Sequence, residues 1–283
     1  MNKRILKNDF LQIEYLTNAL RITGLVPAGK TNMLADLSDS PPISTPYGEF
    51  HFRGGHRLWH SPEAMPRTYI PDTAVTITDL PDGVILEALT EPGTGIRKRI
   101  EIRLAADKPS ATLTHTLIND GVWPVELAPW ALTQFRLGGT VIMPMPVGNV
   151  DSAGLLPNRQ LSLWPYARIS DPRLKLGDEF ITFKADALLP PFKIGYFNPH
   201  GWSAYWLDGV LFRKTIEAHT GSTYPDNNCN VEMYCNDQFM ELESLGPLKI
   251  LNPNTSVMHI EMWDIFYKSE MFPEEIHNAL ATL

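Results

Sequence analysis

Apolar and polar residues alternate at a two-residue period along most of the chain, and this pattern restricts the fold more than any other feature of the sequence. The alternating segments come in pairs that a short turn joins, which is typical of antiparallel hairpins. The pairs are 73–78 with 84–88, 100–104 with 111–118, 202–207 with 210–216, and 230–235 with 239–243, and a late strand is expected over 258–262. Successive hairpins without alternating helices predict stacked antiparallel sheets or a barrel, not a parallel α/β sheet.

Proline and glycine support an all-β fold because they leave little room for long helices. The 283 residues include 24 prolines and 19 glycines. Only the C-terminal end has a helical pattern, in which Pro273 suits a first helical turn and Ile276, Leu280 and Leu283 recur at near-helical spacing. We therefore predict that residues 1–283 form a single β-sandwich domain with a short C-terminal helix.

Charge and cysteine content restrict the partners and the compartment. The 24 Lys and Arg residues against 32 Asp and Glu give a formal net charge of −8, whereas nucleic-acid binding needs a basic surface. No apolar run approaches the roughly 18–20 residues that span a bilayer or has the form of a signal peptide. Cys229 and Cys235 lie on one expected strand, roughly 20 Å apart and too far for a disulfide. We expect a cytoplasmic protein that binds neither nucleic acid nor membrane.

Two long segments rich in proline or glycine, 39–71 and 138–172, separate the hairpins. Loops of this length inside a compact domain are usually functional, so we expect the ligand site beside them. The first contains the densest group of polar and aromatic side chains: His56, Arg57, Trp59, His60 and Glu63, after Gly54 and Gly55. The glycines would let the backbone approach a ligand, and the side chains supply donors, acceptors and a stacking surface. The alternative interpretation is an Arg57–Glu63 ion pair with Trp59 in a core.

The same segment has the spacing of a metal site. On a helix, His56, His60 and Glu63 would share one face, as the ligands of a metal triad do. Gly54 and Gly55 before them and Pro62 among them oppose a continuous helix. We therefore expect neither a metal nor a cofactor.

A pair of glutamates is the second candidate for chemistry. Glu241 and Glu243 share one face of the expected strand 239–243, roughly 7 Å apart. Like charges at that distance disfavour joint ionisation, so one carboxyl group can be tuned as an acid or base. A solvated outer face is the alternative. His219, which follows the strand 210–216, is a further candidate because histidine is best matched to proton transfer near neutral pH.

Several segments together carry a family resemblance. They are 16–22 with 32–34, the strand 114–121 that ends in Asn-Asp-Gly, and 242–244 followed by Leu-Asn-Pro-Asn-Thr at 251–255. Their pattern resembles the galactose mutarotase-like superfamily, the β-supersandwich fold of aldose 1-epimerases and related sugar-binding domains. The resemblance implies that Glu243 is the general base, with Glu241 in that place if the register slips.

One departure from the family pattern concerns the general acid. The epimerases have a histidine in an Asn-His-x-Tyr-Phe segment after the central strand, and here Trp130 stands in the comparable stretch 127–132. The acid would then come from His56, His60 or His219. In the implied reaction one carboxylate removes the proton of the anomeric hydroxyl while an acid protonates the ring oxygen, and no cofactor is needed.

The resemblance leads to one function and two alternatives. A small-molecule sugar or sugar derivative would be the ligand of a mutarotase or epimerase, with Trp59 and Trp130 stacked on the ring and Arg57 bound to its hydroxyl groups. The missing histidine at Trp130 favours instead a carbohydrate-binding module without turnover. The other alternative is a metal-dependent lyase or hydrolase that uses His56, His60 and Glu63 with one of the glutamates.

Overall fold

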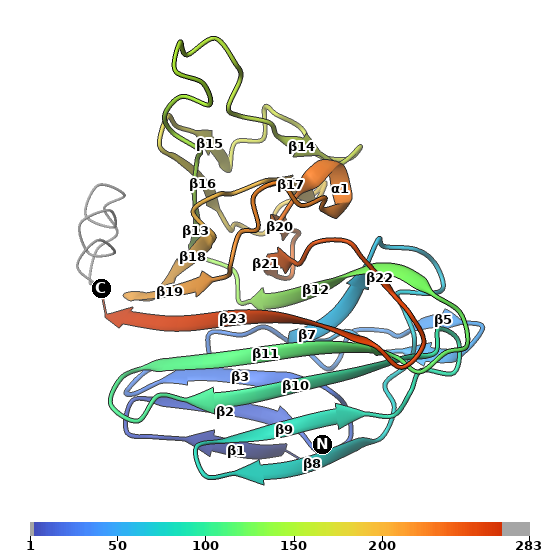
Figure 1. Cartoon of the computed structure of the whole chain (residues 1–283). Coiled ribbons are helices and arrows are strands. Elements are labelled where there is room, and N and C mark those ends of the chain that lie inside the picture. The colour runs from blue at the N-terminus through green and yellow to red at the C-terminus, as the bar shows by residue number, and fades with distance from the viewer. Residues whose placement is uncertain (1–2, 268–283) are drawn as a thin grey trace.

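A computed structural model describes residues 3–267, and strands make up nearly all of the regular structure there (Figure 1). The all-β prediction is confirmed. The one helix of this region, α1 (Pro225–Asn228), is four residues long. Within residues 3–267, no helix is long and apolar enough to cross a membrane. The expected helix at the C-terminal end lies outside the described residues.

An 11-stranded antiparallel sheet, the first sheet, has the order β1-β2-β3-β7-β12-β21-β20-β17-β14, with β4 and β22 paired to β7 and β12. Its strands are β1 (Lys3–Lys7), β2 (Leu11–Leu16), β3 (Ile22–Pro27), β4 (Asp36–Leu37), β7 (Arg53–Ser61), β12 (Val125–Phe135), β14 (Ser162–Leu163), β17 (Phe192–Tyr196), β20 (Val231–Cys235), β21 (Met240–Leu245) and β22 (Lys249–Leu251). Its centre joins segments that lie far apart in the chain.

A 10-stranded sheet, the second sheet, packs across the first in the order β15-β16-β13-β18-β19-β23-β11-β10-β9-β8 (Figure 1). Its strands are β8 (Val75–Leu80), β9 (Gly83–Ala88), β10 (Ile96–Leu104), β11 (Ser110–Asn119), β13 (Thr140–Pro144), β15 (Leu174–Leu176), β16 (Phe180–Lys184), β18 (Trp202–Leu207), β19 (Val210–Thr215) and β23 (Ser256–Tyr267). A separate hairpin consists of β5 (Ile43–Thr45) and β6 (Gly48–Phe50). All four predicted hairpins and the late strand are present.

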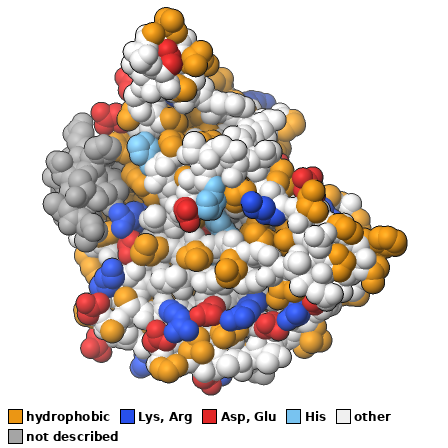
Figure 2. All heavy atoms as spheres, viewed as in Figure 1, with side chains coloured by type: hydrophobic (Ala, Val, Ile, Leu, Met, Phe, Trp, Pro, Cys, Tyr) orange, Lys and Arg blue, Asp and Glu red, His pale blue; other side chains and the backbone are white. Residues whose placement is uncertain are grey.

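Strand β10 shows how the two-residue period places one face of the second sheet in the core. Ile100 and Ile102 are fully buried against the first sheet. Arg97 and Arg103 point outward, where they form ion pairs with acidic side chains of the neighbouring turns and strands, such as Asp82 and Asp120. Figure 2 shows these alternating basic and acidic side chains across the lower strands. Burial of the apolar face, rather than these surface pairs, stabilises the sheet.

Gly54 and Gly55, the second and third residues of β7, have positive φ values of 75° and 71°. A Cβ atom on Gly55 would lie 1.9 Å from the carbonyl oxygen of Ile22, and one on Gly54 would lie 2.1 Å from that of Ala35. The two glycines therefore serve the close approach of neighbouring backbone. We expected the approach of a ligand, and the structure gives them this other role.

Candidate functional site

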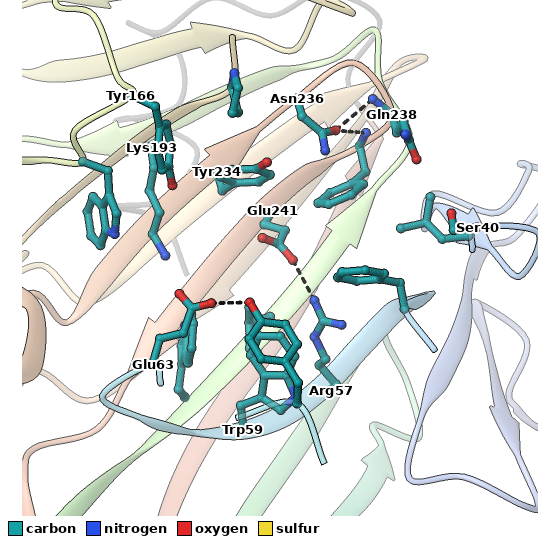
Figure 3. A pocket seen from close by; sticks show the side chains of 18 of the residues that line it. Ser40, Arg57, Trp59, Glu63, Tyr166, Lys193, Tyr234, Asn236, Gln238 and Glu241 are labelled. Carbon is teal, nitrogen blue, oxygen red and sulfur yellow. Dashed lines mark hydrogen bonds and ion pairs between the residues drawn. The ribbon is translucent and has the colours of Figure 1, made fainter. Parts of the chain in front are cut away.

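A cavity of about 480 Å³, the main cavity, lies on the face of the first sheet that points away from the second sheet, because Arg57 and Trp59 of β7 line it while His56 and Leu58 face the space between the sheets. Figure 3 shows the side chains around it. Side chains of β7, β12, β17, β20 and β21 form its floor. Its walls come from loops within the two long segments that we singled out, including Ser40, Glu63, Tyr69, Trp164 and Tyr166. The ligand site was expected beside these segments, and a concave space lies there.

Arg57 and Glu241 meet at the floor of the main cavity. Nη2 of Arg57 donates a hydrogen bond of 3.1 Å to Oε1 of Glu241, and the guanidinium group lies 4.0 Å from the ring centroid of Trp59. Burial, together with the charge of nearby Glu243, raises the pKa of Glu241 to about 7, although Arg57 acts against this rise. A carboxyl group with this pKa can both accept and donate a proton near neutral pH.

Lys193 brings a second cation to the floor. Its Nζ lies 4.5 Å from the ring centroid of Trp164 and 5.0 Å from that of Trp130. The same atom lies 2.8 Å from Oε2 of Glu232 and 2.9 Å from Oε2 of Glu243. Burial lowers the pKa of Lys193, but the two carboxyl groups outweigh it and raise the pKa well above its ordinary value. Lys193 is therefore a fixed ammonium group with aromatic rings on its sides.

Glu243 lies beneath the floor and is fully buried. Its Oε2 accepts hydrogen bonds from Nε1 of Trp130 at 2.7 Å and from Nζ of Lys193 at 2.9 Å. Its Oε1 has no hydrogen-bond partner within residues 3–267. Glu243 does not line the main cavity, whereas Glu241 does. The carboxyl group placed to touch a ligand is therefore that of Glu241, and Glu243 holds the two side chains that cover it.

The walls of the cavity are largely aromatic. Tyr69 donates a hydrogen bond to Glu63, and Tyr166 and Tyr234 lie across the cavity from them (Figure 3). Burial raises the pKa of Tyr234 to about 12, so its hydroxyl group stays protonated at neutral pH. These rings offer stacking surfaces and hydroxyl donors to a ligand.

Five of the sequence-predicted site residues meet in the main cavity: Arg57, Trp59, Glu63, Trp130 and Glu241. They belong to β7, to the loop that follows it, to β12 and to β21, and these segments come together only in the folded protein. In β7 the side chains alternate between the two faces, so the histidines beside Arg57 and Trp59 point the other way. None of the three histidines that we considered as general acids lines the main cavity.

His56 belongs to a buried polar network between the sheets. Nδ1 of His115 donates to the carbonyl oxygen of His259 at 3.1 Å, so the Nε2 atom of His115 accepts the hydrogen of His56 Nε2 at 2.7 Å. Nδ1 of His56 then accepts from the hydroxyl group of Thr133 at 2.9 Å. Burial lowers the pKa of His56 well below its ordinary value. His56 is a neutral core residue.

Glu261 and Lys214 complete this network. Lys214 Nζ lies 2.8 Å from Oε1 of Glu261, which also accepts from Ser244 at 2.5 Å, and Trp263 donates to Oε2 at 2.8 Å. The candidate ligand atoms of His56, His115 and Glu261 all lie within 4.8 Å of one another. Because Lys214 already neutralises Glu261 and the imidazoles bond to each other, the donor set is satisfied without a metal ion.

His60 and His219 also lie away from the cavity. His60 is buried, with Nε2 at 3.8 Å from Oε2 of Glu91, and burial lowers its pKa. His219 is near the surface, with Nδ1 at 3.5 Å from Oε1 of Glu217. The spacing of His56, His60 and Glu63 does not produce a metal triad, because Glu63 follows β7 in a loop that faces the main cavity.

Lys193 is the main residue that our sequence interpretation missed. It is the one charged residue of β17 (Phe192–Tyr196), a strand in which every residue is buried. A lone lysine in an otherwise apolar strand is the signal that points to it, because a buried ammonium group needs an anionic partner. Trp164 also lines the cavity, whereas Trp206 packs against a separate apolar cluster.

Comparison with solved structures identifies the fold. A galactose mutarotase-like protein of Lactobacillus casei matches with a TM-score of 0.61 and 9% identity over 94% of this chain and 100% of that one. A proposed aldose 1-epimerase of Escherichia coli K12 matches with a TM-score of 0.55 and 12% identity over 94% and 99%. The chain therefore has the galactose mutarotase-like β-supersandwich fold, as the sequence predicted.

The same fold occurs in proteins of other descriptions. A TPR-domain containing protein of Parabacteroides distasonis matches with a TM-score of 0.62 and 13% identity, over 94% of this chain and 47% of that one. No family model matches the chain, and no curated protein matches it. Because one fold supports many activities, the function has to be argued from the main cavity.

Proposed function

We propose that the main cavity binds a sugar or sugar derivative and that the protein is a sugar mutarotase or epimerase. The observation that carries the proposal is Glu241, a carboxyl group with a pKa near 7 at the floor of a largely aromatic cavity. Trp59 and Trp130 offer faces for the apolar side of a pyranose. Arg57 and Lys193 offer N–H donors for its oxygen atoms.

In the proposed reaction, the Glu241 carboxylate removes the proton of the anomeric hydroxyl group. The C1–O5 bond breaks and its electron pair goes to the ring oxygen, where the fixed ammonium group of Lys193 stabilises the negative charge. Glu241 then gives this oxygen the proton that it removed from the hydroxyl group. Rotation about the bond to the aldehyde carbon and the reverse steps close the other anomer. Glu243 takes the role of a positioning residue, since it holds Lys193 and Trp130, while Glu241 takes the role that we first gave to Glu243.

The test measures the rate of anomer exchange, by NMR saturation transfer or polarimetry, on neutral, phosphorylated and acidic sugars. We expect Glu241→Gln to lower the exchange rate by about 10²–10⁴-fold, the usual contribution of a positioned acid or base. Glu126→Gln, at the exposed second residue of β12, is the matched control and keeps the rate. Equal rates for Glu241→Gln and the wild type would rule out this role for Glu241.

A carbohydrate-binding module without turnover is the second candidate. It is favoured by the absence of histidine among the residues that line the main cavity within 3–267. It predicts saturable shifts with a sugar and no acceleration of anomer exchange. The metal-dependent lyase or hydrolase is not proposed, because His56 and His60 face away from the cavity.

Two buried thiols, Cys229 and Cys235, support a reducing cytoplasm as the location.

A further inference from the structure

A second cavity of about 40 Å³, the small cavity, shares Arg57 and Trp59 with the main one. Arg21, Phe50 and Ile70 are among its other lining residues. One water molecule needs roughly 10–15 Å³ of such space, so the small cavity accepts a group of one to a few atoms and no sugar ring. Its ligand is therefore a separate question from the ligand of the main cavity.

Two buried guanidinium groups line the small cavity with unused donors. Arg21 and Arg57 are 2% and 3% exposed. Nε and Nη1 of both side chains have no hydrogen-bond acceptor among the described residues. Only their Nη2 atoms have anionic neighbours, at 3.9 Å from Oδ1 of Asp72 for Arg21 and at 3.1 Å from Oε1 of Glu241 for Arg57. Buried donors of charged groups without acceptors are costly, which points to an acceptor in the cavity.

The carboxylates around the small cavity do not supply that acceptor. Asp72 is engaged by Nε of Arg53 at 2.6 Å, closer than its contact with Arg21. Glu91 is engaged by Nζ of Lys98 at 2.5 Å. Burial is the main cause that lowers the pKa of Arg21 to about 9, and the charge of Arg57 adds to it. The region thus has three arginines against Asp72 and a Glu241 that is only partly ionised at neutral pH.

We propose that the small cavity is a binding site for a small inorganic anion of the chloride class, held by the Nε and Nη1 groups of Arg21 and Arg57. An anion accepts hydrogen bonds from several donors at once and offsets the repulsion between two buried guanidinium groups, whereas water offsets only the missing hydrogen bonds. This proposal does not depend on the activity of the main cavity, because its readouts are binding and stability.

The direct test is a crystal grown or soaked in bromide. A bromide anomalous peak is expected beside Arg21 and Arg57, and it is expected to be missing in the Arg21→Gln variant. A peak at surface lysines alone, with water at the small cavity, would overturn the proposal.

The solution test compares thermal unfolding in potassium chloride and in potassium gluconate at equal ionic strength. Since gluconate is too large for the small cavity, we expect the wild-type Tm to be about 2–3 °C higher in chloride. Arg21→Gln should remove this difference, and Arg4→Gln, at an exposed arginine paired with Asp79, should keep it. If Arg21→Gln does not fold, Arg21→Lys retains a charge but lacks the guanidinium donors and should also lose the difference. An equal Tm of the wild type in both salts would overturn the proposal.

Discussion

Nζ of Lys193 lies 2.8 Å from Oε2 of Glu232 and 2.9 Å from Oε2 of Glu243, so one ammonium group joins two buried carboxyl groups below the main cavity. We predict that Lys193→Met lowers the free energy of unfolding by about 3–5 kcal/mol, because buried carboxyl groups lose their counter-charge. Urea denaturation measures the change, and Lys175→Met, at an exposed lysine, is the control. Adding Glu232→Gln should restore part of the loss. A change below about 0.5 kcal/mol for Lys193→Met would contradict this account.

Glu241 gives a second prediction, on the pH dependence of stability. Its folded-state pKa of about 7 lies above the ordinary value of 4.5, so the folded protein holds this proton more tightly than the unfolded chain does. The contribution to stability is fully present below pH 4.5 and is lost as the pH rises through 7, by about 3 kcal/mol in all. Glu241→Gln should lack this decline. Urea titrations of both proteins between pH 4.5 and 8 test it, and parallel curves would show that the pKa is not raised.

The buried histidines give a third prediction, with the opposite sign. Burial lowers the pKa of His259 from 6.5 to about 3. The folded state excludes a proton that the unfolded chain takes up, so this stability is present above pH 6.5 and is lost as the pH falls toward 3. We expect His259→Gln to lose less free energy of unfolding than the wild type between pH 6.5 and 4. Exposed His51→Gln is the matched control and should follow the wild type. An identical acid slope for all three proteins would refute the neutral network.

Two glycines with the same backbone conformation provide a fourth prediction. Gly55 and Gly29 both have a φ of 71°. A Cβ on Gly55 would meet backbone at 1.9 Å, whereas one on Gly29 would have no atom within 4 Å. Gly29→Ala should therefore cost about 1–2 kcal/mol from backbone strain alone, and Gly55→Ala about 3 kcal/mol or more. Thermal unfolding of the two variants separates the effect of backbone strain from that of the contact between the new Cβ and the neighbouring backbone. Equal losses of unfolding free energy would show that β7 shifts to make room.

Much of the fold could be predicted because the second sheet is built from local hairpins. The pairs β8 with β9 and β18 with β19 are each joined by a short turn, and their two-residue period is visible in the sequence. Strand β7 was hidden inside the segment 39–71 because both of its faces are buried. Its polar side chains then look like a loop rather than an alternating strand.

The site was only partly predictable for a related reason. Alternation within β7 separates Arg57 and Trp59 from His56 and His60, but it does not reveal which face has the cavity. That depends on the pairing of β7 with β12 and of β12 with β21, which joins Leu132 to both Arg57 and Glu243. Such long-range register is not encoded in any local window. The lone lysine of β17 is visible in the sequence, but its pairing with Glu232 and Glu243 on β20 and β21 is not.

Paired strands form the floor of the main cavity and loops form its walls. Sequence changes in the floor and in the walls therefore differ in their effect on the fold. Floor positions such as Arg57 and Glu241 alternate with core positions on the same strands, so their backbone cannot shift without disturbing the space between the sheets. The wall residues Ser40, Tyr69 and Trp164 lie outside the strands and are not fixed by a strand register. Loop exchange between proteins of this architecture should therefore transfer ligand preference while the host scaffold keeps its folding, which makes the wall loops the natural targets for redesign.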